Sequence, residues 1–210
     1  MAQQTQAKIQ PGPEIFLIFY IKRRIELGGQ LQWYEAPYCC EENPPKEWLR
    51  IEKAARLFEI NYNQQIRQNL ILNLEKSERL NYESFQTIIR RYMASVLAHH
   101  KEEKAMLTLA LIAFTGMYAR RLAELDLNQK PGILQPIDYR RAIYQISIYG
   151  SHILLSIWTN GWKTFCQDVD LVLERLSLCK QCCSLARRLC VSICIGLAIG
   201  SIFGVYIFIL

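Results

Sequence analysis

The stretch AMLTLALIAFTGMYA, residues Ala105–Ala119, decides the fold, because it carries no charged residue over about four helical turns. A second uncharged stretch, AIYQISIYGSHILLSIW, follows at Ala142–Trp158. Helices that are apolar nearly all round belong inside a domain, and both stretches fall short of the roughly 20 residues that a membrane span needs. We therefore predict a central helical hairpin. The alternative is a hairpin that itself enters a membrane under some condition.

Further helical segments precede this hairpin. The first, Glu14–Leu27, follows Pro13, which suits a first helical turn, and precedes Gly28, which suits a helix end. The second begins after Pro45 and has apolar residues every three or four positions, which places them on one helical face. These apolar residues are Trp48, Ile51, Ala55, Phe58 and Tyr62. We expect the charged residues of the same segment, Arg50, Glu52, Lys53 and Glu59, to face away from them.

Two further helical segments complete the domain. A short one covers 66–74, and a longer one covers 82–98. The longer one repeats the amphipathic spacing at Phe85, Ile88, Ile89, Tyr92 and Val96. Strand-like alternation is scarce along the chain. The sequence therefore predicts an all-α domain over residues 1–186, in which amphipathic helices wrap a central apolar hairpin.

The C-terminal stretch LCVSICIGLAIGSIFGVYIFIL, Leu189–Leu210, predicts a transmembrane helix. As a helix it would extend about 33 Å, enough to span the hydrocarbon core. Arg187 and Arg188 precede it, which leaves the N-terminal bulk in the cytosol and makes 187–210 a tail anchor. A buried core helix is the alternative. Three glycines recur every fourth residue, at Gly196, Gly200 and Gly204, so we expect the spans to self-associate.

Composition and motifs favour a binding protein over an enzyme. The net charge is +6, but acidic and basic residues are mixed, which favours a membrane surface over nucleic acid as a partner. Cys179, Cys182 and Cys183 lack a second ligand pair for zinc, so palmitoylation and ordinary thiols both stay open. His99 and His100 are adjacent and cannot share a helical face. We expect no catalytic residue, no metal and no cofactor.

Several segments carry a family resemblance in their order. ALIAFTGMYARRL at Ala110–Leu122 looks like the leucine-isoleucine-serine-phenylalanine-glycine segment of a first homology region, and YESFQTIIRRYM at 82–93 looks like the helix before it. NGWKTF, residues Asn160, Gly161, Trp162, Lys163, Thr164 and Phe165, resembles the second region's turn, with Asn160 in place of the usual glycine. IEKAARLFEINY at 51–62 matches the third region, and EIFLIFYIKRRIELGG fits the fourth. Together the segments resemble the Bcl-2 family of apoptosis regulators.

The departures from this family pattern concern charge. The asparagine-tryptophan-glycine-arginine signature falls on Lys104, Ala105, Met106 and Leu107, and none of the four is retained. The family's arginine pairs with an aspartate of a bound helix, so Lys101 and Lys104 become the candidates for the missing cation. In the third region Arg56 replaces the usual aspartate. That reversal disfavours this segment as a ligand for another member's groove.

The resemblance implies a Bcl-2-like fold whose apolar groove binds amphipathic helices of related proteins. We expect a pro-survival regulator on a membrane, the mitochondrial outer membrane in preference to the endoplasmic reticulum. The alternatives are a membrane-permeabilising member that acts through its hairpin and tail, and a scaffold with a degenerate groove. The groove wall implied by the family consists of Phe58, Tyr62, Ile66, Ile88, Arg91, Tyr92, Lys104, Leu107, Ala110 and Phe114.

Overall fold

The computed structural model describes residues 12–27, 44–63, 71–76, 80–94, 104–128, 138–158 and 161–178. These ranges contain seven helices and no strand, which confirms the all-α class. The helices are α1 (Pro13–Glu26), α2 (Lys46–Asn63), α3 (Leu72–Lys76), α4 (Tyr82–Tyr92), α5 (Lys104–Leu127), α6 (Tyr139–Ile157) and α7 (Trp162–Leu178). Ile66, Asn160 and the predicted anchor at 187–210 lie outside the described residues.

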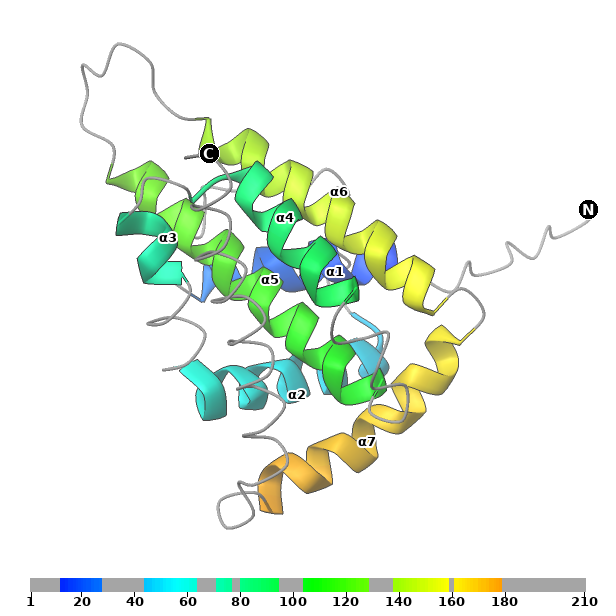
Figure 1. The fold of residues 1–210 in the computed structure, drawn as a ribbon. Coiled ribbons are helices and arrows are strands. Elements are labelled where there is room, and N and C mark those ends of the chain that lie inside the picture. Colours follow the sequence, from blue (N-terminus) through cyan, green and yellow to red (C-terminus); the bar gives the residue numbers. More distant parts are fainter. Residues whose placement is uncertain are drawn as a thin grey trace, which may run out of the picture.

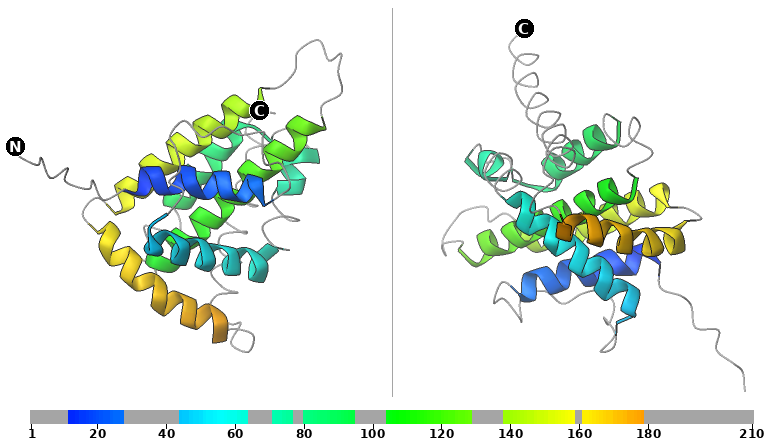
Figure 2. Two further views of the ribbon diagram at one scale, coloured as in Figure 1. Left: turned by 180° about the vertical axis from the view of Figure 1, so that it is seen from behind. Right: turned by 90° about the horizontal axis from the view of Figure 1, so that it is seen from below.

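The central element is α5, which packs against α1, α2, α6 and α7. Every residue from Leu107 to Ala119 is buried, as the absence of charge in this stretch predicts. Figure 1 shows α5 and α6 running in opposite directions, and Figure 2 shows α4 and α1 on opposite sides of them. Beyond Ala119 the helix continues through charged residues, because Arg120 and Arg121 both pair with Glu124 one turn later.

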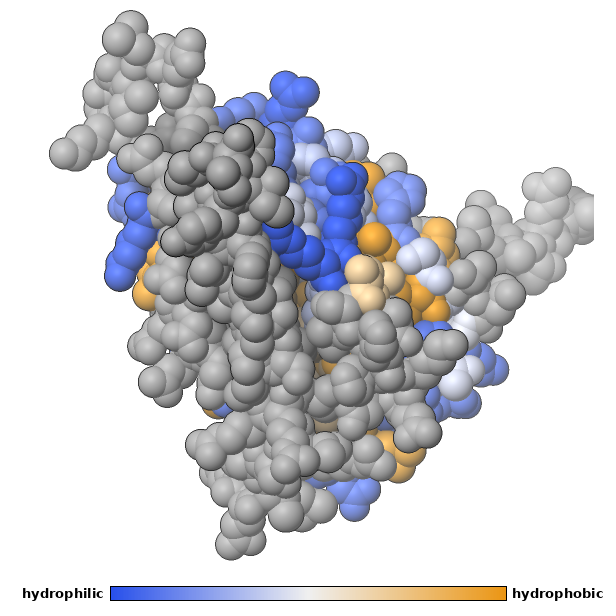
Figure 3. Space-filling view, viewed as in Figure 1, coloured by the Kyte–Doolittle hydropathy of each residue, from blue (hydrophilic) through white to orange (hydrophobic). Residues whose placement is uncertain are grey.

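Helix α6 departs from the prediction that it is buried all round. Its side chains at Tyr144, His152 and Ser156 are exposed, although the helix packs against α1, α4 and α5. Figure 3 shows described hydrophobic side chains at the surface over its C-terminal half. Tyr, His and Ser carry polar atoms that water solvates at neutral pH, so a stretch without formal charge can still present a solvent-facing side.

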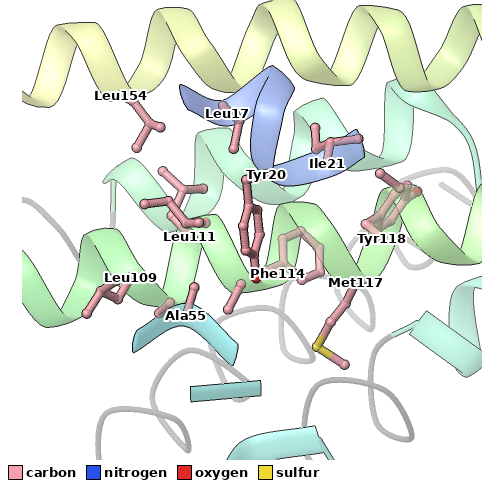
Figure 4. Close-up of a cluster of buried hydrophobic side chains, with 14 of the residues drawn as sticks. Leu17, Tyr20, Ile21, Ala55, Leu109, Leu111, Phe114, Met117, Tyr118 and Leu154 are labelled. Atoms are coloured by element: carbon pink, nitrogen blue, oxygen red, sulfur yellow. The ribbon is translucent and has the colours of Figure 1, made fainter. Parts of the chain in front are cut away.

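Helix α1 lies close to both α5 and α6. Each of those helices has a glycine where α1 approaches: a Cβ at Gly116 of α5 would lie 2.6 Å from Cε1 of Tyr20, and one at Gly150 of α6 would lie 2.6 Å from Cδ2 of Leu17. Figure 4 shows Leu17, Tyr20 and Ile21 of α1 among side chains of α5 and α6. The missing side chains thus make room for α1, whose apolar residues are almost entirely buried.

An aromatic cluster joins the N-terminal half of α1 to two other helices. The Phe16 ring lies 5.9 Å from the Trp48 ring of α2 and 5.6 Å from the Trp162 ring of α7, measured between centroids. Phe19 also contacts Trp48, at 5.2 Å. Rings at these separations pack favourably beyond their simple burial of area. Helix α1 therefore connects the α5–α6 pair to α2 and α7.

We predict that Gly116→Ala destabilises the fold more than Gly150→Ala. The new methyl at 116 meets the rigid ring of Tyr20, whereas the one at 150 meets the movable end of Leu17. Overpacking costs about 1–3 kcal/mol, against a helix-propensity gain of about 1 kcal/mol for replacing glycine. Urea unfolding of the full chain in detergent measures the free energy of unfolding of each variant and shows which of the two is less stable. In a Tyr20→Ala background the cost of Gly116→Ala should fall, although the Cγ of Arg24 at 3.1 Å remains close, and an unchanged cost would contradict the proposed clash.

Candidate functional site

The described members of the implied groove wall come from three helices. Phe58 and Tyr62 lie on α2, Ile88 and Tyr92 on α4, and the remaining apolar members on α5, namely Leu107, Ala110 and Phe114. All seven belong to one continuous hydrophobic cluster. Arg91 lies on the exposed side of α4. The structure thus brings the apolar members together within a single core.

Direct contacts fix several of these side chains. The Phe58 and Tyr62 rings are 4.6 Å apart, and Phe114 stacks on Phe85 with ring centroids 5.8 Å apart. The hydroxyl of Tyr92 donates a 2.7 Å hydrogen bond to the carbonyl oxygen of Leu107, which ties the end of α4 to the start of α5. None of the seven apolar wall residues is more than 8% exposed. In this structure the wall is therefore packed rather than open to solvent.

Lys104 lies away from these aromatic contacts. Its ammonium sits 4.1 Å from the ring centroid of Trp158, at the end of α6, in a cation–π geometry. The indole nitrogen of Trp158 donates a 3.0 Å hydrogen bond to Oγ1 of Thr108. These contacts join the start of α5 to the end of α6. Leu107, at the position of the family's arginine, is completely buried.

The segment expected to form the second region's turn connects α6 to α7. The amide of Gly161 donates to the carbonyl of Trp158 at 3.0 Å, and a Cβ at Gly161 would approach the Trp158 ring to 3.0 Å. Phe165 lies 5.1 Å from Trp162 and 5.2 Å from Trp158, between ring centroids. The aromatic residues of this segment therefore have packing roles at the junction of α6 and α7.

A buried polar cluster links α1 to α2, and the sequence analysis missed it. Glu59 accepts hydrogen bonds at Oε1 from the Tyr20 hydroxyl at 2.6 Å and from Nε of Arg24 at 2.9 Å. Nη2 of Arg24 donates to the second carboxylate oxygen, so the pair is bidentate. Arg24 and Glu59 are each only 7% exposed. We call Tyr20, Arg24 and Glu59 the α1–α2 polar cluster.

The prediction that Glu52 and Glu59 turn away from the apolar side of α2 was wrong. Both are buried, and Glu52 lies 3.6 Å from the Arg23 guanidinium. Helical spacing could have predicted the burial of Glu59, since Glu59 follows Ala55 by four positions and therefore lies on the same helical face. The prediction took every carboxylate of α2 to be solvent-facing. A carboxylate can instead be buried when an arginine on another helix pairs with it.

Burial dominates the electrostatics of the α1–α2 polar cluster. It raises the pKa of the Glu59 carboxyl above its ordinary value, while the Arg24 guanidinium and the Tyr20 hydroxyl act in the opposite direction. Burial, followed by the nearby Glu59 carboxylate, raises the pKa of Tyr20 well above its ordinary value. The Tyr20 hydroxyl therefore stays protonated and donates to Glu59. These groups hold two helices together, and nothing in their arrangement provides a nucleophile.

A cavity of about 200 Å³ lies beside this cluster. Its lining comes from α1, α2, α5 and Ile71 just before α3, and it includes the Arg24–Glu59 pair. Arg121 on its wall donates to both carboxylate oxygens of Glu75, at 2.6 and 2.8 Å. Arg120 pairs with Glu124 at 3.0 Å. Because its arginines are already paired with carboxylates, the cavity offers no ready anion site.

Other reactive groups in the described part of the chain are few. Cys166 is buried, and burial raises the pKa of its thiol to about 11, so the thiol is neutral at physiological pH. Within the described ranges, no three His, Cys, Asp or Glu side chains are grouped closely enough to hold a metal ion. In the same ranges, no helix has both the length and the hydropathy required to cross a membrane. Gly196, Gly200 and Gly204 fall outside these ranges.

Comparisons of the chain with protein-family models, with curated proteins and with solved structures found no match.

We predict that Glu59→Leu destabilises the fold by about 3–5 kcal/mol, because it leaves the Arg24 charge buried without its partner. Adding Arg24→Met should restore most of that loss, since an apolar pair can replace a buried ion pair. Both changes are made in a Tyr20→Phe background, so that no hydroxyl is left without its acceptor. Urea unfolding of the full chain in detergent measures each variant.

Asp170→Asn provides the matched control for this prediction. Asp170 pairs with Arg50 at 2.5 Å, but both side chains are more than 40% exposed. Exposed pairs contribute about 0–1 kcal/mol, so this change should cost little. A double variant as unstable as Glu59→Leu alone would show that the Arg24–Glu59 pair does not account for the loss.

Proposed function

We propose that this chain is a Bcl-2-like regulator of apoptosis that binds the amphipathic, death-promoting helices of related proteins. In this proposal it is a pro-survival member, and residues 187–210 anchor it to the mitochondrial outer membrane. The all-helical architecture and the burial of α5 are compatible with such a fold. The choice of this family rests on the resemblance of the sequence segments and on their order along the chain.

The pro-survival assignment rests on the burial of the apolar side of α2 and on the ion pair that holds this helix. Its apolar residues Ile51, Ala55 and Phe58 are buried, and Glu59 on the same helix is held by Arg24 and Tyr20. A helix that acts as a ligand for another protein must expose its apolar side. Releasing α2 would break a buried ion pair, which costs several kcal/mol. Fixed in this way, α2 serves as a wall of a binding surface rather than as a released ligand.

The proposed binding surface lies where α2 and α4 meet the Ala110 and Phe114 side of α5. Because its side chains are buried, a partner helix can reach them only after the local packing opens. The hydrogen bond from Tyr92 to the Leu107 carbonyl is one contact at this position. If a partner helix binds only after this hydrogen bond breaks, the apparent affinity is the intrinsic affinity multiplied by the fraction of molecules in the open state. Binding would then depend on the stability of the α4–α5 contact.

The same burial favours a second candidate, a scaffold whose groove has become part of the core and takes no helix. The stacked Phe85 and Phe114 rings and the close Phe58 and Tyr62 rings are ordinary core packing in that case. Under this candidate, charge substitutions at Phe114 or Tyr62 change folding only. The two candidates therefore differ in whether any helix binds the folded chain.

We predict that the full chain in detergent binds at least one peptide from a panel of fluorescent death-promoting helices. Tyr92→Phe should strengthen that binding while lowering stability by about 1 kcal/mol, because it removes the α4–α5 hydrogen bond but keeps the ring. Phe114→Glu should abolish it, with circular dichroism used to verify helix content. Fluorescence anisotropy measures affinity, and urea unfolding measures stability.

Absence of binding by every peptide, with the folded state verified, would overturn the helix-binding function in favour of the scaffold. A liposome assay separates the membrane-permeabilising alternative. The pro-survival protein should inhibit leakage driven by another family member. Leakage caused by this chain alone would contradict the pro-survival assignment.

A further inference from the structure

The side of α2 that faces away from α5 presents an apolar stripe. Ile60 is 69% exposed and Leu49 is 43% exposed, while Leu57 between them is partly buried. Positions 49, 57 and 60 fall on one side of a helix at 3.6 residues per turn. Single exposed leucines are common on protein surfaces, but several aligned along one helix form a patch that marks a contact surface.

This stripe borders a hollow of about 340 Å³ between α2 and the end of α1. Leu49, Leu57 and Ile60 line it together with basic side chains, Arg23 from α1 and Lys53 and Arg56 from α2. We call these six residues the α1–α2 outer surface. Phe58 and Tyr62 lie on the buried side of α2, so the α1–α2 outer surface is separate from the surface of the proposed function and does not depend on it.

The charge of this surface is positive. Its acidic lining residue, Glu52, is buried and paired with Arg23 at 3.6 Å. Within the described ranges, neither Lys53 nor Arg56 lies within ion-pair distance of a carboxylate. Two cations thus lie beside the three apolar side chains, and an occupant that carries acidic groups would satisfy them.

We propose that the α1–α2 outer surface is a docking site for an acidic amphipathic helix of a partner protein. The partner's apolar side chains, spaced three or four residues apart, would fill the hollow against Leu57 and Ile60, and its flanking Asp or Glu residues would meet Lys53 and Arg56. The apolar side chains border a hollow of about 340 Å³, into which separate side chains of a helix can insert. Charge complementarity sets the orientation and speeds association, and the buried apolar residues supply most of the affinity.

A designed peptide tests this site. The probe is a fluorescein-labelled helix of roughly 18 residues, long enough to be helical, with leucines along one side and glutamates elsewhere. Its controls are a scrambled peptide of the same composition and a version with lysine in place of glutamate. Each is titrated against the full chain in detergent, and binding is followed by fluorescence anisotropy. We expect binding of the first peptide only, and weaker binding as salt rises.

Variants of the chain locate the site. Ile60→Glu and Lys53→Glu should each weaken binding by about tenfold or more, as loss of a central contact does. Leu171→Glu is the matched control, because Leu171 lies on α7 and is 61% exposed. It introduces the same charge at another exposed apolar position, and it should leave binding unchanged.

Several outcomes would overturn the proposal. These are no binding of the acidic peptide, equal binding of its scrambled control, or equal weakening by Leu171→Glu. Binding of water-soluble, short-chain phosphatidylserine to the full chain that Ile60→Glu abolishes, without binding of the peptide, would assign the surface to a membrane instead. Because Ile60→Glu leaves the buried side of α2 intact, failure here is distinguishable from failure of the death-promoting helices to bind.

Discussion

The close approach of α1 to α5 and α6 constrains the rest of the fold. It depends on two helical positions without side chains, Gly116 and Gly150, and it brings Tyr20 to a place where its hydroxyl can reach Glu59. Arg24, one turn further along α1, completes the α1–α2 polar cluster. The position of α2 against α5 is thus linked to that of α1, and the apolar side of α2 stays buried as a result.

The elements that hydrophobic spacing defines were predictable from the sequence. Helix α1 begins at Pro13, as the proline suggests, and α5 is buried through its uncharged stretch. The burial of Glu59 was not predicted, because its ion-pair partner lies 35 residues away on another helix and periodicity describes one helix at a time. The exposed side of α6 was missed because uncharged polar side chains were counted with apolar ones.

For the candidate site, the sequence predicts only that its apolar residues are buried. Helical spacing predicts that the apolar wall residues of α2 and α4 face inward, and they are buried in the core together with those of α5, but their choice as a groove wall came from the family resemblance. The contact between Tyr92 and the Leu107 carbonyl depends on how the helices meet in space. The same is true of Lys104, which contacts Trp158 across the α5–α6 pair. Such details arise from tertiary packing, which a linear pattern does not encode.

The glycines where α1 approaches α5 and α6 also limit how this sequence can diverge over evolution. Most core positions tolerate exchange among apolar residues of similar volume, so the hydrophobic skeleton can drift until little identity is left. Gly116 cannot be exchanged for a larger residue while a bulky ring occupies position 20. A larger residue at 116 would therefore require a smaller one at 20. Distant descendants of this chain should therefore retain the match between a small residue on α5 and a large one on α1 long after their overall similarity has faded.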